Sequence, residues 1–79
     1  MIDFKPGDIV KVRDMYDDLM TYDQNHQLVH IEPGTTLLVL DVKSQKNRRA
    51  KIMFLHNETK VWAESLNYYW SSLIKKVSS

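Results

Sequence analysis

Cysteine is missing from this chain of 79 residues, and proline and glycine occur only twice each. Without cysteine the fold can have neither a disulfide framework nor a thiolate metal site, and such chains are typical of a reducing compartment. Long apolar runs are also missing, since the longest purely aliphatic stretch covers residues 37–40 and is too short to cross a bilayer. The first residues show no basic stretch followed by an apolar one, so we expect no secretory signal. These absences predict a soluble, cytoplasmic protein.

The sequence also lacks the motifs that support catalysis or cofactor binding. It has no G-x-S-x-G nucleophile motif, and its two glycines each follow a proline instead of forming a phosphate-binding loop. Aspartates gather between residues 14 and 23, but the glycine and the distal glutamate of a Ca²⁺ loop are missing. His26 and His30 have no third ligand at a recognisable spacing. We therefore expect a protein that is not an enzyme and that holds no cofactor or metal.

The composition is that of one small globular domain covering residues 1–79. Hydrophobic residues make up 43% of the chain and charged residues 27%, which is typical of a folded protein near the smallest size that a single core can support. The net charge is +1, yet acidic side chains prevail in residues 1–41 and basic side chains in residues 42–79. This asymmetry predicts either a bipolar surface or two halves whose charges meet and screen one another in the fold.

All the prolines and glycines lie in two short phrases of the same kind. Pro6-Gly7 precedes the β-branched stretch at residues 9–12, and Pro33-Gly34 precedes a second such stretch at residues 35–40. Proline presets the backbone of one central turn residue, and glycine takes the positive φ that a type II turn requires at the next. Each phrase therefore predicts a turn that leads directly into a strand.

Alternation of apolar and polar residues predicts an all-β fold, a small five-stranded barrel. The expected strands cover residues 8–13, 35–43, 50–56, 60–64 and 74–77, with the last pairing with the first. Residues 14–32 are expected to form a long first loop that could contain a helical turn around residues 16–20 and a short strand at residues 28–31. Leu66, Tyr69, Trp70 and Leu73 follow a three-to-four-residue spacing, which favours a short helical turn before the last strand.

This order of elements resembles the Src-homology-3-like (SH3-like) barrels. More narrowly, the chain resembles small uncharacterised SH3-like barrel proteins of tailed bacteriophages, including cyanophages. Their F-x-P-G-D-x-V opening is similar to residues Phe4 to Val10, their P-G-T-x-x-x-V strand to residues Pro33 to Val39, and their W…S-x-L close to residues Trp70 to Leu73. The opening is also similar to the KOW motif, without the glycines that follow it there. The resemblance implies a barrel and a phage source, but turn and core residues imply no activity.

The acidic first loop is the first candidate for a contact surface. Its protein-binding candidates are Tyr16, Asp17, Asp18 and Tyr22. Tyrosine supplies contact area at low entropic cost, and carboxylates steer association with basic surfaces. We therefore expect a non-enzymatic adaptor that binds another protein, from the host or from the phage itself if the resemblance holds.

Nucleic-acid binding is the main alternative. The candidate residues Lys46, Arg48, Arg49 and Lys51 surround one hairpin loop, with Lys43 close by in the sequence. Cations of this kind can contact phosphates, and aromatic residues at positions 62 and 68–70 could stack on bases. The same cations could instead be a solvated hairpin that prevents edge-to-edge pairing, with the tryptophans in the core.

A third possibility is a structural, self-associating virion component. Tyr68 and Tyr69 are adjacent aromatic residues, and exposed aromatics at these positions would mark a self-association surface. The sequence leaves the partner, the oligomeric state and the choice between these functions open.

Overall fold

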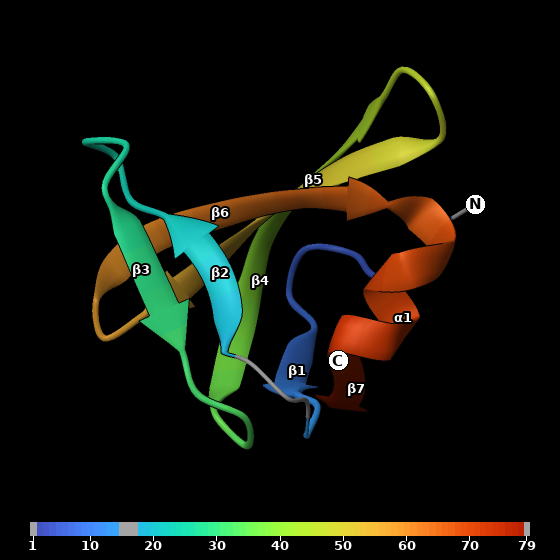
Figure 1. Ribbon diagram of the computed structural model, residues 1–79. Coiled ribbons are helices and arrows are strands. Elements are labelled where there is room, and N and C mark those ends of the chain that lie inside the picture. The colour runs from blue at the N-terminus through green and yellow to red at the C-terminus, as the bar shows by residue number, and fades with distance from the viewer. Residues whose placement is uncertain (1, 15–17, 79) are drawn as a thin grey trace.

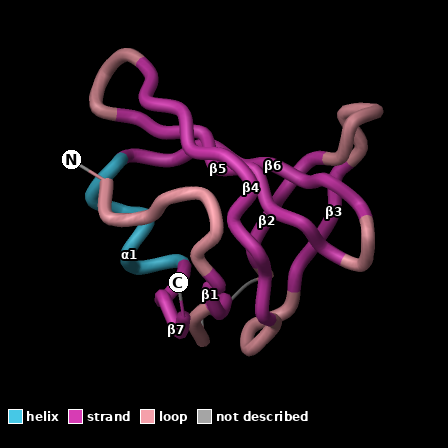
Figure 2. Tube along the Cα trace, turned by 180° about the vertical axis from the view of Figure 1, so that it is seen from behind, coloured by secondary structure: helices cyan, strands magenta, loops and turns pink. Residues whose placement is uncertain are grey.

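Seven strands form one antiparallel sheet in the computed structural model, which describes residues 2–14 and 18–78 (Figure 1). The sheet is strongly curled into a half-barrel, and its strand order is β3-β2-β6-β5-β4-β1-β7 (Figures 1 and 2). The strands are β1 (Ile9–Val12), β2 (Leu19–Tyr22), β3 (Leu28–Ile31), β4 (Thr36–Gln45), β5 (Arg49–His56), β6 (Thr59–Leu66) and β7 (Ile74–Ser78). A 3₁₀ turn, η1 (Asn67–Tyr69), and a short helix, α1 (Trp70–Leu73), connect β6 to β7.

The expectation of an all-β fold with a short helical turn before the last strand is confirmed. The pairing of the last strand with the first is confirmed as well, because β7 lies antiparallel to β1. The prediction of five strands is wrong for the described residues, because part of the expected long loop folds into the hairpin β2–β3. Its second arm is the short strand expected at residues 28–31.

The expected helical turn around residues 16–20 is wrong for the part that the structure describes. Leu19 and Thr21 are buried while Met20 and Tyr22 are exposed, which is the two-residue period of a strand. Tyr16 lies outside the described residues, so the structure describes only the end of that expected turn.

The two Pro-Gly turns have the predicted backbone. Gly7 has a φ of 95° and Gly34 a φ of 88°, and no atom lies within 4 Å of a Cβ built on either, so φ alone is what requires glycine. The Gly7 amide donates to the Val39 carbonyl on β4 at 2.9 Å, and the Gly34 amide donates to the Val12 carbonyl on β1 at 2.8 Å. The first turn is therefore bonded to β4 and the second turn to β1, and these two hydrogen bonds align β1 with β4.

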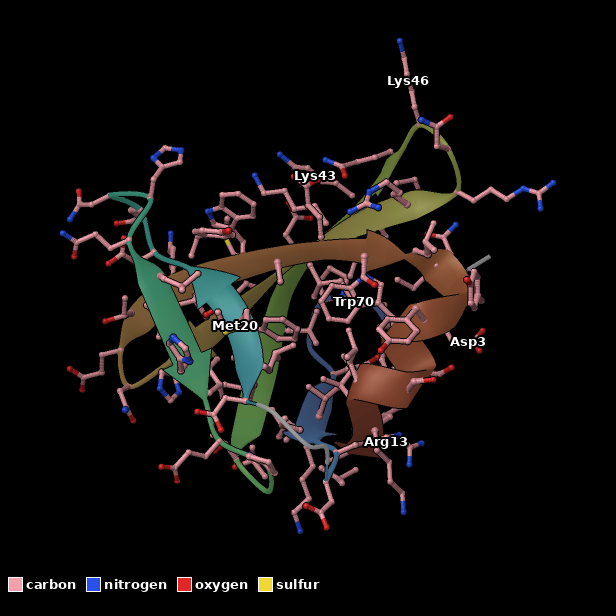
Figure 3. All side chains as sticks on the ribbon, in the orientation of Figure 1. Asp3, Arg13, Met20, Lys43, Lys46 and Trp70 are labelled. Carbon is pink, nitrogen blue, oxygen red and sulfur yellow. The ribbon has the colours of Figure 1, made fainter. Side chains whose placement is uncertain are left out.

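The core lies on the concave face of the sheet. Alternate side chains of the strands meet there, and the α1 residue Trp70 fills one end (Figure 3). The Trp70 ring centroid lies 5.9 Å from that of Phe54, and its Nε1–H donates to the Ala50 carbonyl at 3.0 Å. The fully buried side chains of this core are Val10, Val12, Ile31, Leu37, Val39, Ala50, Ile52, Phe54, Val61, Trp70 and Ile74. Because side chains alternate between the two faces, the exposed strand residues between these core positions form the outer face.

Candidate functional site

A row of large side chains crosses the outer face of the sheet on four neighbouring strands. Leu28 of β3 is the direct cross-strand partner of Tyr22 of β2, Tyr22 is the partner of Trp62 of β6, and Trp62 is the partner of Met53 of β5. Direct partners in an antiparallel sheet place their side chains on the same face. Leu28 is 46% exposed and Tyr22 is 39% exposed, so this end of the row meets water. We call these four residues the outer row.

Trp62 is the centre of an aromatic and cationic cluster. Its ring centroid lies 5.1 Å from that of Tyr22 at a tilt of 34°, and 6.3 Å from that of His26 in an edge-on arrangement. The Lys51 ammonium nitrogen lies 4.2 Å from the Trp62 ring centroid, within the range of a cation–π contact. The cluster is pre-organised, since three neighbours from three segments hold the indole in place.

An open groove of about 560 Å³ runs beside this cluster. Its lining residues are Met20, Tyr22, His26, Arg49, Trp62, Ala63 and Glu64. At the groove, β2 and β6 share only the Tyr22–Trp62 pair within the described residues. The groove therefore combines an aromatic wall with an arginine and a carboxylate.

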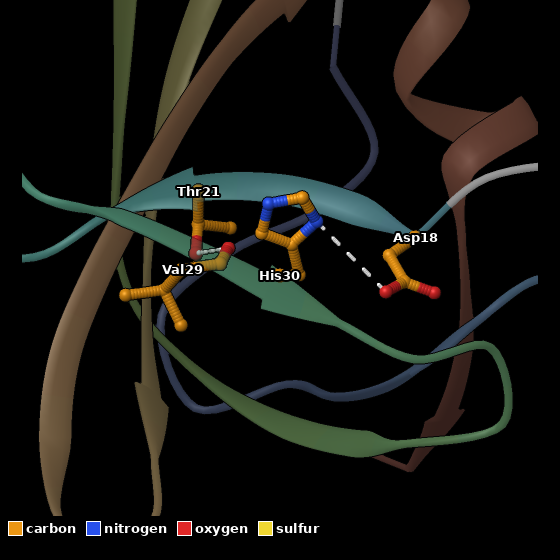
Figure 4. A network of polar contacts seen from close by, with 4 residues as sticks. All are labelled: Asp18, Thr21, Val29 and His30. Atoms are coloured by element: carbon orange, nitrogen blue, oxygen red, sulfur yellow. Dashed lines mark hydrogen bonds and ion pairs between the residues drawn. The ribbon is translucent and has the colours of Figure 1, made fainter.

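The protein-binding residues expected from the sequence are placed in part. Tyr22 lies on the outer face and lines the groove. Asp18 lies before β2, where its Oδ2 is 3.9 Å from Nδ1 of His30 on β3 (Figure 4). Tyr16 and Asp17 fall outside the described residues. The structure therefore places Tyr22 in the groove and Asp18 beside the edge of the β2–β3 hairpin.

The expected basic cluster surrounds the β4–β5 hairpin. The loop between the paired residues Gln45 and Arg49 has three residues, and Asn47 and Arg48 in it both have positive φ, at 62° and 57°. Lys46 extends from the tip of this hairpin (Figure 3). Arg49 lines the groove, and Lys51 contacts Trp62. The cations thus divide between the hairpin tip and the outer face.

The expected aromatic stacking set is corrected by the structure. Trp70 is fully buried, so it cannot stack on a base, whereas Trp62 is only partly buried. The alternative that put both tryptophans in the core is therefore correct for Trp70 alone. Tyr68 and Tyr69 are exposed on η1, with Tyr68 73% exposed. The Asn67 amide donates to the Arg48 carbonyl at 2.7 Å, which holds η1 against the basic hairpin. Tyr68 and Tyr69 are therefore close in the fold to the β4–β5 turn.

Sequence reasoning missed the outer-face roles of Leu28 and Met20. The signal that could have found Met20 is alternation, because it lies between the buried Leu19 and Thr21. Within the described residues, no group of three or more His, Asp or Glu side chains could hold a metal ion. None of the helices in residues 2–14 and 18–78 is both long and apolar enough to cross a membrane.

Comparison with known proteins gives no relative from which a function could be taken. No family model, curated protein or solved structure matches the chain.

Proposed function

We propose that the chain is an SH3-like barrel that acts as a non-enzymatic protein-interaction module. The strand order supports the fold, because β7 lies beside β1, the helical turn precedes β7, and a hairpin lies within the connection from β1 to β4. The contact surface in this proposal is the groove together with the outer row. It includes Tyr22, which the sequence had already indicated.

The observation that carries the proposal is the partly exposed stack of Tyr22 on Trp62 beside the groove. Tyrosine, tryptophan and arginine are the residues that most often dominate binding energy at protein interfaces. Here the first two are already stacked, and Arg49 lines the same groove. A rigid aromatic surface of this kind loses little conformational entropy when a partner covers it.

The test compares two variants that each place a lysine at an exposed apolar position. Met20→Lys changes the groove, whereas Val77→Lys changes β7 at the opposite edge of the sheet, and both native side chains are about half exposed. Wild-type protein and both variants are immobilised and exposed to a nuclease-treated lysate of the cells in which the protein is naturally made. We expect one protein to be retained by wild type and by Val77→Lys and lost from Met20→Lys. Retention that Met20→Lys does not reduce would exclude the groove as the contact surface.

A second candidate function is nucleic-acid binding at the basic hairpin. The observation that favours it is the backbone hydrogen bond from Asn67 to Arg48, which brings the exposed Tyr68 and Tyr69 to the cations of the β4–β5 turn. Together, cations and exposed aromatic rings are the components of a single-strand binding surface.

The test of this second function is the salt dependence of binding to a labelled single-stranded oligonucleotide. If Arg48 and Arg49 both contact phosphates, Arg48→Ala with Arg49→Ala reduces the slope of log K against log salt by about 1.4. The control is Lys5→Ala with Lys60→Ala, which removes two exposed cations, one before the first Pro-Gly turn and one on β6. Equal slopes for the two double variants would show that the basic hairpin is not a specific phosphate-binding site.

A further inference from the structure

The strand β3 forms one end of the sheet. In the strand order it neighbours β2 alone, and no other described strand pairs with its second edge (Figure 1). The close view in Figure 4 shows β3 alongside β2, with the Thr21 hydroxyl donating to the Val29 carbonyl at 2.8 Å. One edge of β3 is therefore fully paired and the other is available.

The hydrogen-bonding phase of the hairpin shows which groups face the available edge. The Asp23 amide donates to the Gln27 carbonyl at 3.0 Å, so these two residues form a hydrogen-bonded pair at the end of the hairpin. Antiparallel partners alternate between hydrogen-bonded and non-hydrogen-bonded pairs, so Thr21–Val29 is hydrogen-bonded while the pairs containing Leu28 and His30 are not. The amide and carbonyl of both Leu28 and His30 therefore point away from β2.

Except for its short length of four residues, the β3 edge has few of the features that usually block strand addition. Its sequence, Leu-Val-His-Ile, contains no proline and no lysine, and its register with β2 is continuous over all four residues. The strand at the other end of the sheet differs, because β7 carries Lys75 and Lys76 and has a register shift against β1. Of the two ends of the sheet, β3 is therefore the one suited to receive another strand.

The charge around β3 indicates what kind of strand it would receive. Residues 14–32 contain five acidic side chains and no lysine or arginine. Asp18 lies 3.9 Å from His30, Asp23 lies in the turn before β3, and Glu32 follows β3 directly. Leu28 adds an exposed apolar side chain that belongs to the outer row. An apolar segment with basic flanks complements this edge in both shape and charge.

We propose that β3 binds an extended segment of a partner protein by strand addition, and that this segment is apolar at its centre and flanked by lysine or arginine. The backbone groups of Leu28 and His30 supply the hydrogen bonds, Leu28 extends the outer row onto the added strand, and the acidic flanks select the basic residues. The proposal rests on the function as a protein-interaction module and specifies the partner and its binding mode.

The decisive variants are His30→Pro and His30→Ala. Both remove the imidazole and its contact with Asp18, but only proline removes the outward amide. Because the His30 amide is not used by β2, proline at this edge position leaves the hairpin hydrogen bonds in place. The pair of variants therefore isolates one backbone donor.

The probe is a set of peptides selected from a random short-peptide library against immobilised wild-type protein. We expect selected peptides with apolar centres and basic flanks, and slower amide hydrogen exchange at Leu28 and His30 when they bind. Loss of one hydrogen bond and the added ring should weaken binding by about tenfold or more in His30→Pro, with little change in His30→Ala. If His30→Pro does not fold, peptides N-methylated at alternate backbone positions supply the same test, because only one of the two alternations should abolish binding.

Four results would overturn the proposal, either in its binding mode or in the partner segment that it names. These are undiminished binding to His30→Pro, equal loss in both variants, selection of no peptide or of acidic peptides, and self-association of the wild type through β3. None of these results decides the proposed function itself. Peptides that bind His30→Pro but not Met20→Lys would keep the interaction module and reject strand addition at β3.

Discussion

Tyr22 and Trp62 form the one ladder pair that joins β2 to β6 within the described residues, and the same two rings lie 5.1 Å apart. The β2–β3 hairpin is therefore attached to the rest of the sheet at a point where a backbone pair and an aromatic contact coincide. This arrangement makes the pair both the centre of the proposed contact surface and the structural link that positions the β3 edge.

The first prediction concerns this link. Trp62→Ala removes the Tyr22 contact and the Lys51 cation–π contact, and we expect it to lower the free energy of unfolding by about 2 kcal/mol. Amide exchange should accelerate more in β2 and β3 than in β4 and β5, because the hairpin loses its anchor. Denaturant unfolding and hydrogen exchange measure the two effects.

Lys51→Met is the control for this prediction, since it keeps an apolar stem over the ring and removes the charge. We expect it to cost only about 0.5 kcal/mol. A Trp62→Ala protein with wild-type exchange in the hairpin would mean that the aromatic pair does not anchor β2 to β6.

The second prediction concerns Trp70, whose indole is fully buried and donates to the Ala50 carbonyl at 3.0 Å. Trp70→Phe keeps an aromatic ring against Phe54 but loses the donor and leaves space, so we expect a loss of about 2 kcal/mol in the free energy of unfolding. Trp70→Ala should cost about 4 kcal/mol, which is a large part of the stability of so small a domain.

Thermal and denaturant unfolding of both Trp70 variants check these values. Equal stability of Trp70→Phe and wild type would show that the Nε1 hydrogen bond contributes nothing net. A smaller loss for alanine than for phenylalanine would contradict the assignment of Trp70 to the core.

The third prediction concerns Asp8, a fully buried carboxylate in the first Pro-Gly turn. Its Oδ2 accepts a hydrogen bond from the Lys5 amide at 3.0 Å and lies 3.4 Å from the Lys76 ammonium on β7. We expect Asp8→Ala to cost about 2 kcal/mol, because the Lys5 amide loses a charged acceptor and a buried side chain is removed. Lys76→Met should cost about 1 kcal/mol, since the Lys76 side chain is 41% exposed and water screens the pair.

A double-mutant cycle tests whether these two residues interact. We expect the double variant to be more stable than the sum of the single losses predicts by about 1 kcal/mol. Strict additivity would mean that Lys76 makes no favourable contact with the buried carboxylate, and that the backbone hydrogen bond carries the whole effect of Asp8.

The parts of the fold that depend on local backbone chemistry could be predicted from the sequence. Gly7 and Gly34 have positive φ because their turns require it, and each turn leads to a strand as expected. The strand at residues 28–31 was expected, but its partner β2 was missed, because β2 has only four residues and is stabilised by partners distant in sequence, such as Trp62 for Tyr22. Period-two alternation over four residues is too short to distinguish from a polar loop.

The candidate site shows the same division between local and distant effects. The sequence indicated Tyr22 as a contact residue, and the structure puts it in the groove. That Trp62 would meet Tyr22, Lys51 and His26 could not be predicted, because these contacts depend on the order of strands in the sheet. The outward-facing amides and carbonyls of Leu28 and His30 could not be predicted either. Which residues of β3 bond to β2 is set by the pairing in the hairpin, and the composition of the chain does not determine that pairing.

The last prediction concerns two hairpin turns that contain no glycine and yet hold residues at positive φ. Asn57 and Glu58 connect β5 to β6 with φ values of 49° and 64°, and Arg48 has a φ of 57° in the turn between β4 and β5. Residues other than glycine and asparagine are strained in this left-handed region. We expect Glu58→Gly and Arg48→Gly each to raise the free energy of unfolding by about 1 kcal/mol, as measured by denaturant unfolding.

The two substitutions should differ in their effect on binding. Glu58 lies in a turn that contributes nothing to the groove, to the β3 edge or to the basic hairpin, so Glu58→Gly should stabilise the protein and leave every interaction unchanged. If the basic hairpin contacts phosphates, Arg48→Gly should stabilise the protein and weaken oligonucleotide binding, because it relieves the backbone strain and removes a cation. Strain that is retained at a charged position is consistent with a binding role for that residue. Stabilisation by Arg48→Gly without any loss of oligonucleotide binding would count against a phosphate contact at Arg48.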